Sequence, residues 1–109
     1  MTEETVLFSG ELGTQRVRVW LQPEGGGVAL NSHDIGPGLE PFFGEDEIET
    51  FLTIRPTQLA ELARLLGCPP DAGEVIAALA DRYRGDSAAT THLRALLDEH
   101  GIAYDFHIF

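Results

Sequence analysis

Apolar and polar side chains alternate with a period of two along the first half of the chain. Because successive side chains of a strand point to opposite faces of a sheet, such alternation predicts half-buried strands. The chain shows this alternation, or a short apolar run compatible with it, at residues 5–9, 14–21, 28–32 and 47–55. The proline- and glycine-rich stretch 22–27 interrupts the pattern, and it predicts a loop inside an antiparallel hairpin.

The stretch between residues 33 and 46 follows no single period. A Gly-Pro-Gly sequence at 36–38 predicts a turn, since proline presets φ and glycine adopts conformations closed to other residues. Pro41 excludes a regular helix or a central strand here. We expect this arch to fold against the core, because it carries the apolar side chains Leu39, Phe42 and Phe43.

From Pro56 onward the apolar residues follow the period of a helix. The first helix is predicted from Pro56 to Gly67, where a left-handed residue ends it. Asp71 resembles the start of a capping box that opens a second helix. A third helix is predicted to begin after Asp86 or Ser87 and to end at His100 and Gly101, with the following residues along its buried side: Ala89, Leu93, Leu96 and Leu97.

Residues 102–108 alternate again, and they predict a closing strand that pairs antiparallel within the sheet. The chain of 109 residues is long enough for one core, which indicates a single domain, 1–109. The order of elements is a β-meander, about three helices and a closing strand. It predicts an α+β fold, a two-layer sandwich with the helices packed on one face of the sheet.

The two faces of the predicted sheet differ. The side chains expected to face the helices are Val17, Val19, Ile48, Leu52, Ile54, Tyr104 and Phe106. Four other side chains then fall on the opposite face, namely Trp20, Phe51, His107 and Phe109. Soluble monomers seldom leave a large aromatic patch uncovered, so either the arch aromatics, a second subunit in a homodimeric module, or another partner covers it.

The charge balance bears on the kind of partner. The chain has 18 acidic residues, seven arginines and no lysine, which gives a formal charge of −11. Such a surface repels nucleic acid and anionic membranes, and it favours a basic protein partner. The single cysteine cannot form an internal disulfide, and the N-terminal residues lack a signal-peptide pattern. We therefore expect a cytoplasmic location.

An acidic cluster surrounds the arch and is the first hypothesis for the interface with a basic partner, with the aromatic face as the alternative interface. Its members are Asp34, Glu40, Glu45, Asp46, Glu47 and Glu49, with no basic residue among them. Recognition residues concentrate on loops that a rigid scaffold presents, and exposed acids raise the association rate with a cationic partner.

No catalytic or cofactor signature occurs in the sequence. The four histidines lack the short spacing to other ligands that a zinc site uses. We therefore expect a non-enzymatic protein with no cofactor and no metal. The alternative from another class is a small metal-dependent or acid/base enzyme, in which His33 and Asp34 act with the carboxylates at 45–49.

Four further blocks of the sequence form a pattern: Leu30–Gly36, Phe42–Gly44, Asp46–Glu49 leading into Leu52–Ile54, and the closing Gly101–Phe106. This pattern resembles that of small acidic bacterial proteins of the toxin-immunity type, including immunity proteins of contact-dependent growth inhibition. Ile48 stands where such sequences usually have an aromatic residue. The resemblance implies an α+β fold and an inhibitor that binds a basic toxin domain, and it identifies no residue as contacting the toxin.

Overall fold

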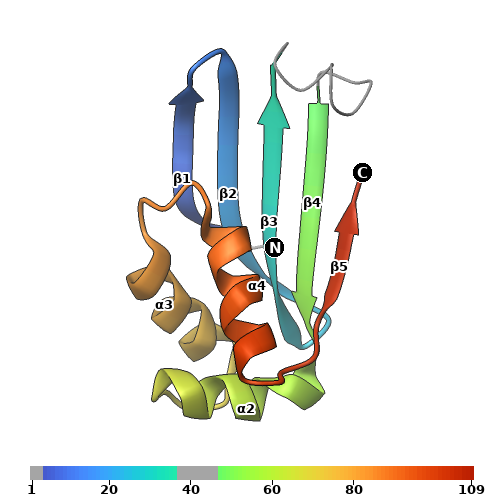
Figure 1. Ribbon diagram of the computed structural model, residues 1–109. Coiled ribbons are helices and arrows are strands. Elements are labelled where there is room, and N and C mark those ends of the chain that lie inside the picture. Colours follow the sequence, from blue (N-terminus) through green and yellow to red (C-terminus); the bar gives the residue numbers. More distant parts are fainter. Residues whose placement is uncertain (1–3, 37–46) are drawn as a thin grey trace.

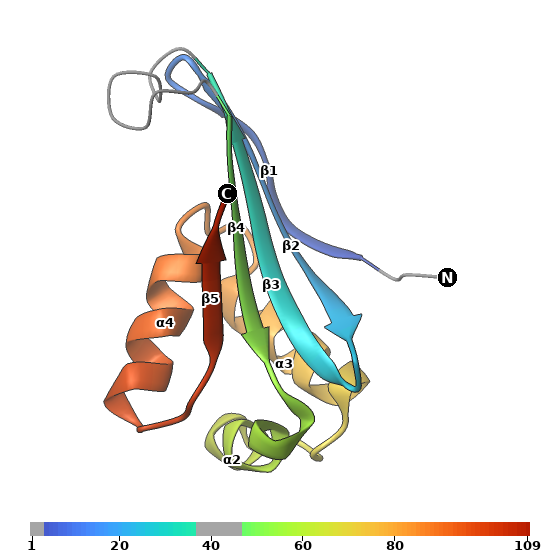
Figure 2. The same ribbon diagram turned by 90° about the vertical axis from the view of Figure 1, so that its right-hand side faces the viewer.

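The computed structural model describes residues 4–36 and 47–109, which form a five-stranded antiparallel sheet and three helices. Figure 1 and Figure 2 show the helices packed against one face of the sheet. The strands lie side by side in the order of the chain. The predicted α+β sandwich is therefore confirmed. In chain order the elements are β1 (Thr5–Leu12), β2 (Gln15–Glu24), β3 (Gly27–Ile35), β4 (Glu47–Ile54), α2 (Pro56–Leu66), α3 (Ala72–Tyr83), α4 (Ala89–Glu99) and β5 (Asp105–Ile108).

The core lies between the three helices and the sheet face that looks toward them, which we call the inner face. The largest buried side chains come from both layers: Leu21, Leu30, Leu52 and Ile54 from strands, and Leu62, Leu79, Leu93 and Leu97 from helices. The side chains of β2 and β4 that were predicted to face the helices are all buried in this core: Val17, Val19, Ile48, Leu52 and Ile54. Tyr104 and Phe106 are partly buried against the same core.

The turn between β2 and β3 is tighter than predicted. Residues 22–27 do not form a loop, because β2 continues through Pro23 to Glu24 and β3 begins at Gly27. Only Gly25 and Gly26 make the turn, both with positive φ, as a two-residue hairpin turn requires. The pairing of β1 with β2 ends at Leu21. Pro23 therefore has no neighbour on the β1 side, and its lack of an N–H costs no hydrogen bond there.

The closing strand is shorter than predicted. β5 spans Asp105–Ile108 and pairs antiparallel with β4, which confirms its place in the sheet. Ile108 near the end of the strand is 57% exposed, whereas Ile102 packs into the core at 4%. The chain between the end of α4 and the start of β5 crosses from the helix layer to the sheet edge (Figure 2).

The helix boundaries follow local chemistry. Pro56 occupies the first turn of α2, and Gly67 ends it in the left-handed conformation with φ of 73°. The Asp71 carboxylate accepts a hydrogen bond from the Glu74 backbone N–H, as the capping pattern predicted. The prediction that Asp86 or Ser87 caps α4 is wrong by one or two residues, because Ala88 occupies that position and Asp86 accepts from its N–H.

The arch lies outside the described residues from Pro37 onward. Leu39, Phe42 and Phe43, which were predicted to pack against the core, lie outside the described residues, and their packing stays a prediction. Residues 37–46 connect the end of β3 to the start of β4. None of the helices in the described ranges is long and apolar enough to cross a membrane.

The contrast between Ile102 and Ile108 gives a direct test of the C-terminal segment. Ile102→Ala should lower the free energy of unfolding by about 2–5 kcal/mol, because it empties a buried site. Ile108→Ala should change it by less than about 0.5 kcal/mol, since that side chain is largely exposed. Urea denaturation followed by circular dichroism measures both. Equal losses for the two variants would contradict this placement.

Candidate functional site: the outer face of the sheet

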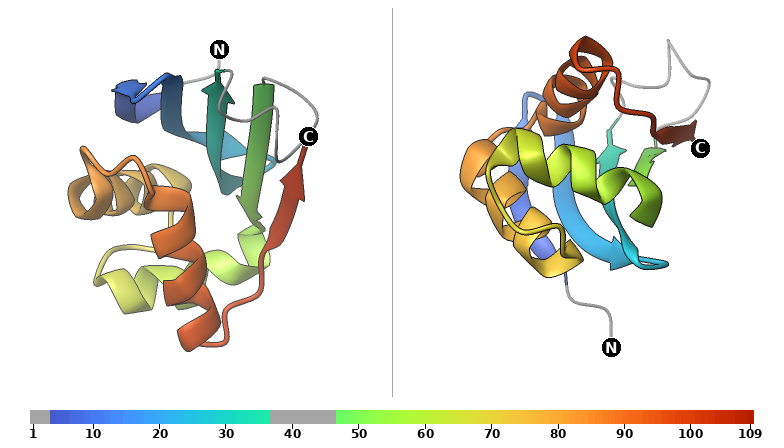
Figure 3. Two further views of the ribbon diagram at one scale, coloured as in Figure 1. Left: turned by 45° about the horizontal axis from the view of Figure 1, so that its top comes forward. Right: turned by 90° about the horizontal axis from the view of Figure 1, so that it is seen from below.

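The sheet face opposite the helices, which we call the outer face, is covered by none of the described elements. The two views in Figure 3 show all three helices on the same side of the sheet. Strand pairing arranges the outer-face side chains in rows across the strands. One row is Trp20, Asn31, Phe51 and His107, and the next is Arg18, His33, Glu49 and Phe109.

The four aromatic and histidine residues predicted for this face all lie on it. The rings of Phe51 and Phe109 meet edge to face with centroids 5.5 Å apart, and the ring of His107 lies 6.2 Å from that of Phe109. Trp20 lies two strands away, where its indole N–H donates to Gln22 at 2.9 Å. The predicted patch is thus a cluster at β4 and β5 with one separate indole on β2.

Members of the acidic cluster are divided among both faces. Glu47 and Glu49 project from the outer face, whereas Asp34 lies on the inner face between Val17 and Ile48 in neighbouring strands. Burial beside these apolar residues raises the pKa of the Asp34 carboxyl, and nearby His33 partly opposes the rise. The other members, Glu40, Glu45 and Asp46, lie outside the described residues.

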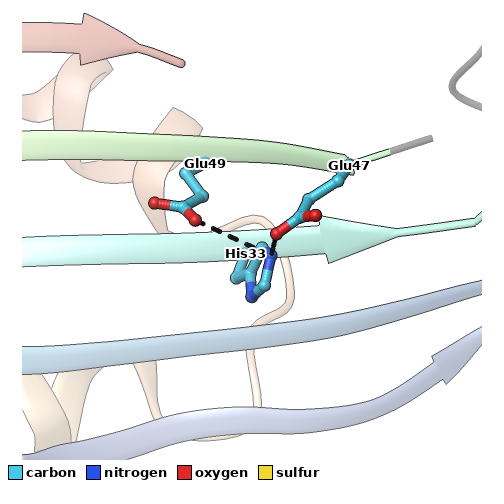
Figure 4. A group of neighbouring side chains, drawn as sticks. All are labelled: His33, Glu47 and Glu49. Atoms are coloured by element: carbon cyan, nitrogen blue, oxygen red, sulfur yellow. Dashed lines mark hydrogen bonds and ion pairs between the residues drawn. The ribbon is translucent and has the colours of Figure 1, made fainter. Parts of the chain in front are cut away.

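His33 and Asp34 cannot act on one metal ion or one substrate atom. They are consecutive strand residues, so their side chains point to opposite faces of β3. His33 instead meets two carboxylates of β4 (Figure 4): its Nε2 lies 2.6 Å from Glu47 Oε1 and 3.9 Å from Glu49 Oε1. Neither contact follows from sequence spacing, because the strand register determines them.

A concavity of about 430 Å³ lies at the β4–β5 corner of the outer face. Glu47, Glu49, Phe51 and Phe109 line it. The two interfaces that the sequence suggested separately therefore meet here, two residues from each set around one hollow. Two carboxylates beside two aromatic rings form a polar, anionic site with apolar walls, which we call the corner pocket.

The trio His33, Glu47 and Glu49 could hold a divalent cation. Each residue offers one ligand atom, and these atoms lie within 4.8 Å of one another. One imidazole nitrogen with two carboxylate oxygens suits ions such as Mn²⁺ or Zn²⁺. The sequence had suggested His33 together with Asp34 and the carboxylates at 45–49. The strand register brings Glu47 and Glu49 to His33 and places Asp34 on the opposite face.

The comparisons with known proteins add no assignment to this geometry. No family model, curated protein or solved structure matches the chain.

Asp34 predicts a dependence of stability on pH. Folding raises the pKa of this carboxyl, so the folded state favours its protonated form. The stability that it contributes is fully present below the unfolded pKa, near 3.8, and is lost as pH rises through the folded pKa. Asp34→Asn should therefore raise the melting temperature by a few degrees at pH 7. This gain should vanish below pH 3.8.

Exposed Glu61 supplies the control, because Glu61→Gln should change the melting temperature little at either pH. Calorimetry across the pH range measures both variants. A melting temperature at pH 7 that is unchanged or lower in Asp34→Asn would contradict a desolvated carboxylate at this position.

We expect no tightly held metal at the His33 trio. Three partly exposed protein ligands leave the remaining coordination positions to water, and the His33 ring is already paired with Glu47. Metal analysis after dialysis should find no stoichiometric ion, and equimolar Zn²⁺ or Mn²⁺ should leave the melting temperature unchanged. A stabilisation that disappears in His33→Ala but persists in His107→Ala would support the metal-dependent alternative instead.

Proposed function

We propose that this chain is a non-enzymatic acidic protein that binds a basic protein partner at the corner pocket. The observation that carries the proposal is the joint lining of that pocket by Glu47, Glu49, Phe51 and Phe109. Carboxylates form charge-assisted hydrogen bonds with guanidinium and ammonium groups. Aromatic faces attract the same cations and pack against their aliphatic stems.

The formal charge of −11 supports a basic partner over nucleic acid or an anionic membrane. A net negative field raises the rate of encounter with a cationic surface, while contacts in the pocket provide selectivity. Phe109 contributes much of the available contact area, since it is 72% exposed. Large aromatic side chains of this kind frequently anchor protein interfaces.

The specific form of the proposal is an immunity-type inhibitor of a basic bacterial toxin domain, acting in the cytoplasm. It rests on the sequence resemblance to toxin-immunity proteins together with the acidic surface. The metal-dependent alternative has one observation in its favour, the three ligand atoms of His33, Glu47 and Glu49.

Binding of a cation can be tested before the partner is known. An arginine hexapeptide titrated into labelled protein should shift the backbone amide signals of Glu49, Phe51 and Phe109. The affinity should fall steeply between about 0.05 and 0.5 M salt, because the screening length of exposed charges is about 10 Å at 0.1 M and shortens as salt rises. A glutamate hexapeptide should produce no comparable shifts.

A charge-matched pair of variants locates the site. The double change Glu47→Gln with Glu49→Gln should weaken the arginine peptide roughly fivefold or more, a loss of about 1 kcal/mol. Glu61→Gln with Glu74→Gln removes the same charge from exposed helix positions and should weaken it less than twofold. Equal weakening by both pairs would show that only net charge attracts the peptide.

The immunity form has its own test. If the neighbouring gene encodes a basic toxin domain, co-expression of this chain should restore growth of cells that produce the toxin. Glu47→Lys with Glu49→Lys should reduce protection, whereas Glu61→Lys with Glu74→Lys should not. No protection by the unaltered chain would remove the immunity assignment, and full protection by the first variant would move the interface away from β4.

A further inference from the structure

Opposite charges lie on opposite sides of the central strand on the outer face. Arg18 on β2 and Glu49 on β4 belong to one row, with His33 between them. Arg16 and Glu47 belong to the next row, on either side of Ile35. Basic side chains thus lie on β2 and acidic ones on β4. Within one copy, however, Arg18 also pairs with Glu4 at 3.1 Å and Arg16 lies 4.0 Å from Glu11, and the protein as a whole is strongly acidic.

A twofold axis parallel to β3 would superimpose these unlike charges. Two copies packed face to face around such an axis exchange the left and right sides of the face while each row stays at its own level. Strand β2 of one copy then lies over β4 of the second copy, so Arg18 meets Glu49 and Arg16 meets Glu47. An axis across the strands would place β2 over β2 and bring like charges together.

The neutral side chains follow the same symmetry. In the row beside Arg18, Trp20 and Phe51 stand on either side of Asn31, so the indole of each copy meets the phenyl ring of the other. Asn31 lies on the axis itself. Its side chain is only 3% exposed, so the flanking side chains of the row, and not Asn31, make the contact.

We infer that the outer face binds a second copy of this chain, with β2 of each copy packed over β4 of the other. The charged side chains are accessible for this contact. Arg16 and Arg18 keep 77% and 39% of their side-chain area exposed, and Glu47 and Glu49 keep 52% and 44%. Within one copy, Arg18 is held over the Trp20 ring at 4.5 Å, which orients its guanidinium along the face.

The size of the face sets the strength of this dimer. Five strands about 4.8 Å apart and about 20 Å long cover roughly 480 Å² per copy, about three fifths of the ~800 Å² per partner that a standard stable interface buries. We therefore expect a dissociation constant roughly between micromolar and millimolar. This self-association does not depend on the proposed function. The two compete, since the same carboxylates would serve the second copy and a basic partner.

Charge reversal provides a test that a folding defect cannot imitate. Sedimentation velocity of the unaltered chain, from about 10 µM to about 1 mM, should show a reversible monomer–dimer equilibrium. Arg18→Glu alone and Glu49→Arg alone should each weaken the dimer roughly tenfold or more, because each creates two like-charge contacts. Mixing the two variants should restore a heterodimer, in which both contacts again join opposite charges.

Exposed Arg64 and Glu61 on α2 provide the control pair. Arg64→Glu and Glu61→Arg should dimerise like the unaltered chain, both separately and mixed. A chain that stays monomeric up to about 1 mM would overturn the inference. So would dimers that survive both outer-face reversals, or a mixture of those two variants that fails to associate. No partner protein enters the measurement, so its result is independent of the test of basic-partner binding.

Discussion

Antiparallel pairing assigns every strand residue to one of two faces, and the helices cover only one of them. The core depends on this constraint, because the inner face must present a continuous apolar surface to the helix layer. A slip of one residue in β2 would turn Arg18 inward and Val19 outward, so the packing of the helices holds the register in place. The same register then fixes the composition of the outer face. A feature selected for folding thereby determines which charges and rings the protein presents to a partner.

Local periodicity was sufficient to predict the elements, because a period of two and a period near 3.6 can each be recognised within a single segment. It failed where the neighbouring strand decides the outcome. Gly27 looked like part of a loop, yet it is the first residue of β3, at a position where a Cβ would collide with the Ile54 carbonyl oxygen and only glycine fits. Pro23 looked like a strand breaker, yet it is tolerated beyond the end of the pairing with β1. In both cases the neighbouring strand decides the outcome, and the sequence around Gly27 or Pro23 does not show where that strand lies.

The candidate site was predictable only in parts. Alternation placed Phe51, His107 and Phe109 on one face, and charge counting drew attention to Glu47 and Glu49. These residues meet in one pocket because β4 and β5 are neighbours and pair in a particular register. Three helices separate the two strands in the chain, so the sequence does not show that they pair. The adjacent pair His33 and Asp34 shows the reverse error, because closeness in sequence suggested cooperation that a strand forbids.

The β1 edge of the sheet is protected against the addition of a further strand. In β1 an irregularity in pairing at Leu7 turns both Leu7 and Phe8 toward the core, and the Leu7 carbonyl accepts a hydrogen bond of 2.7 Å from the Gly85 N–H. A bulged edge strand whose backbone is already bonded elsewhere is a poor template for another chain. The hydrogen bond from Gly85, between α3 and α4, thus makes β1 less able to pair with a strand of another molecule, the step by which fibres grow.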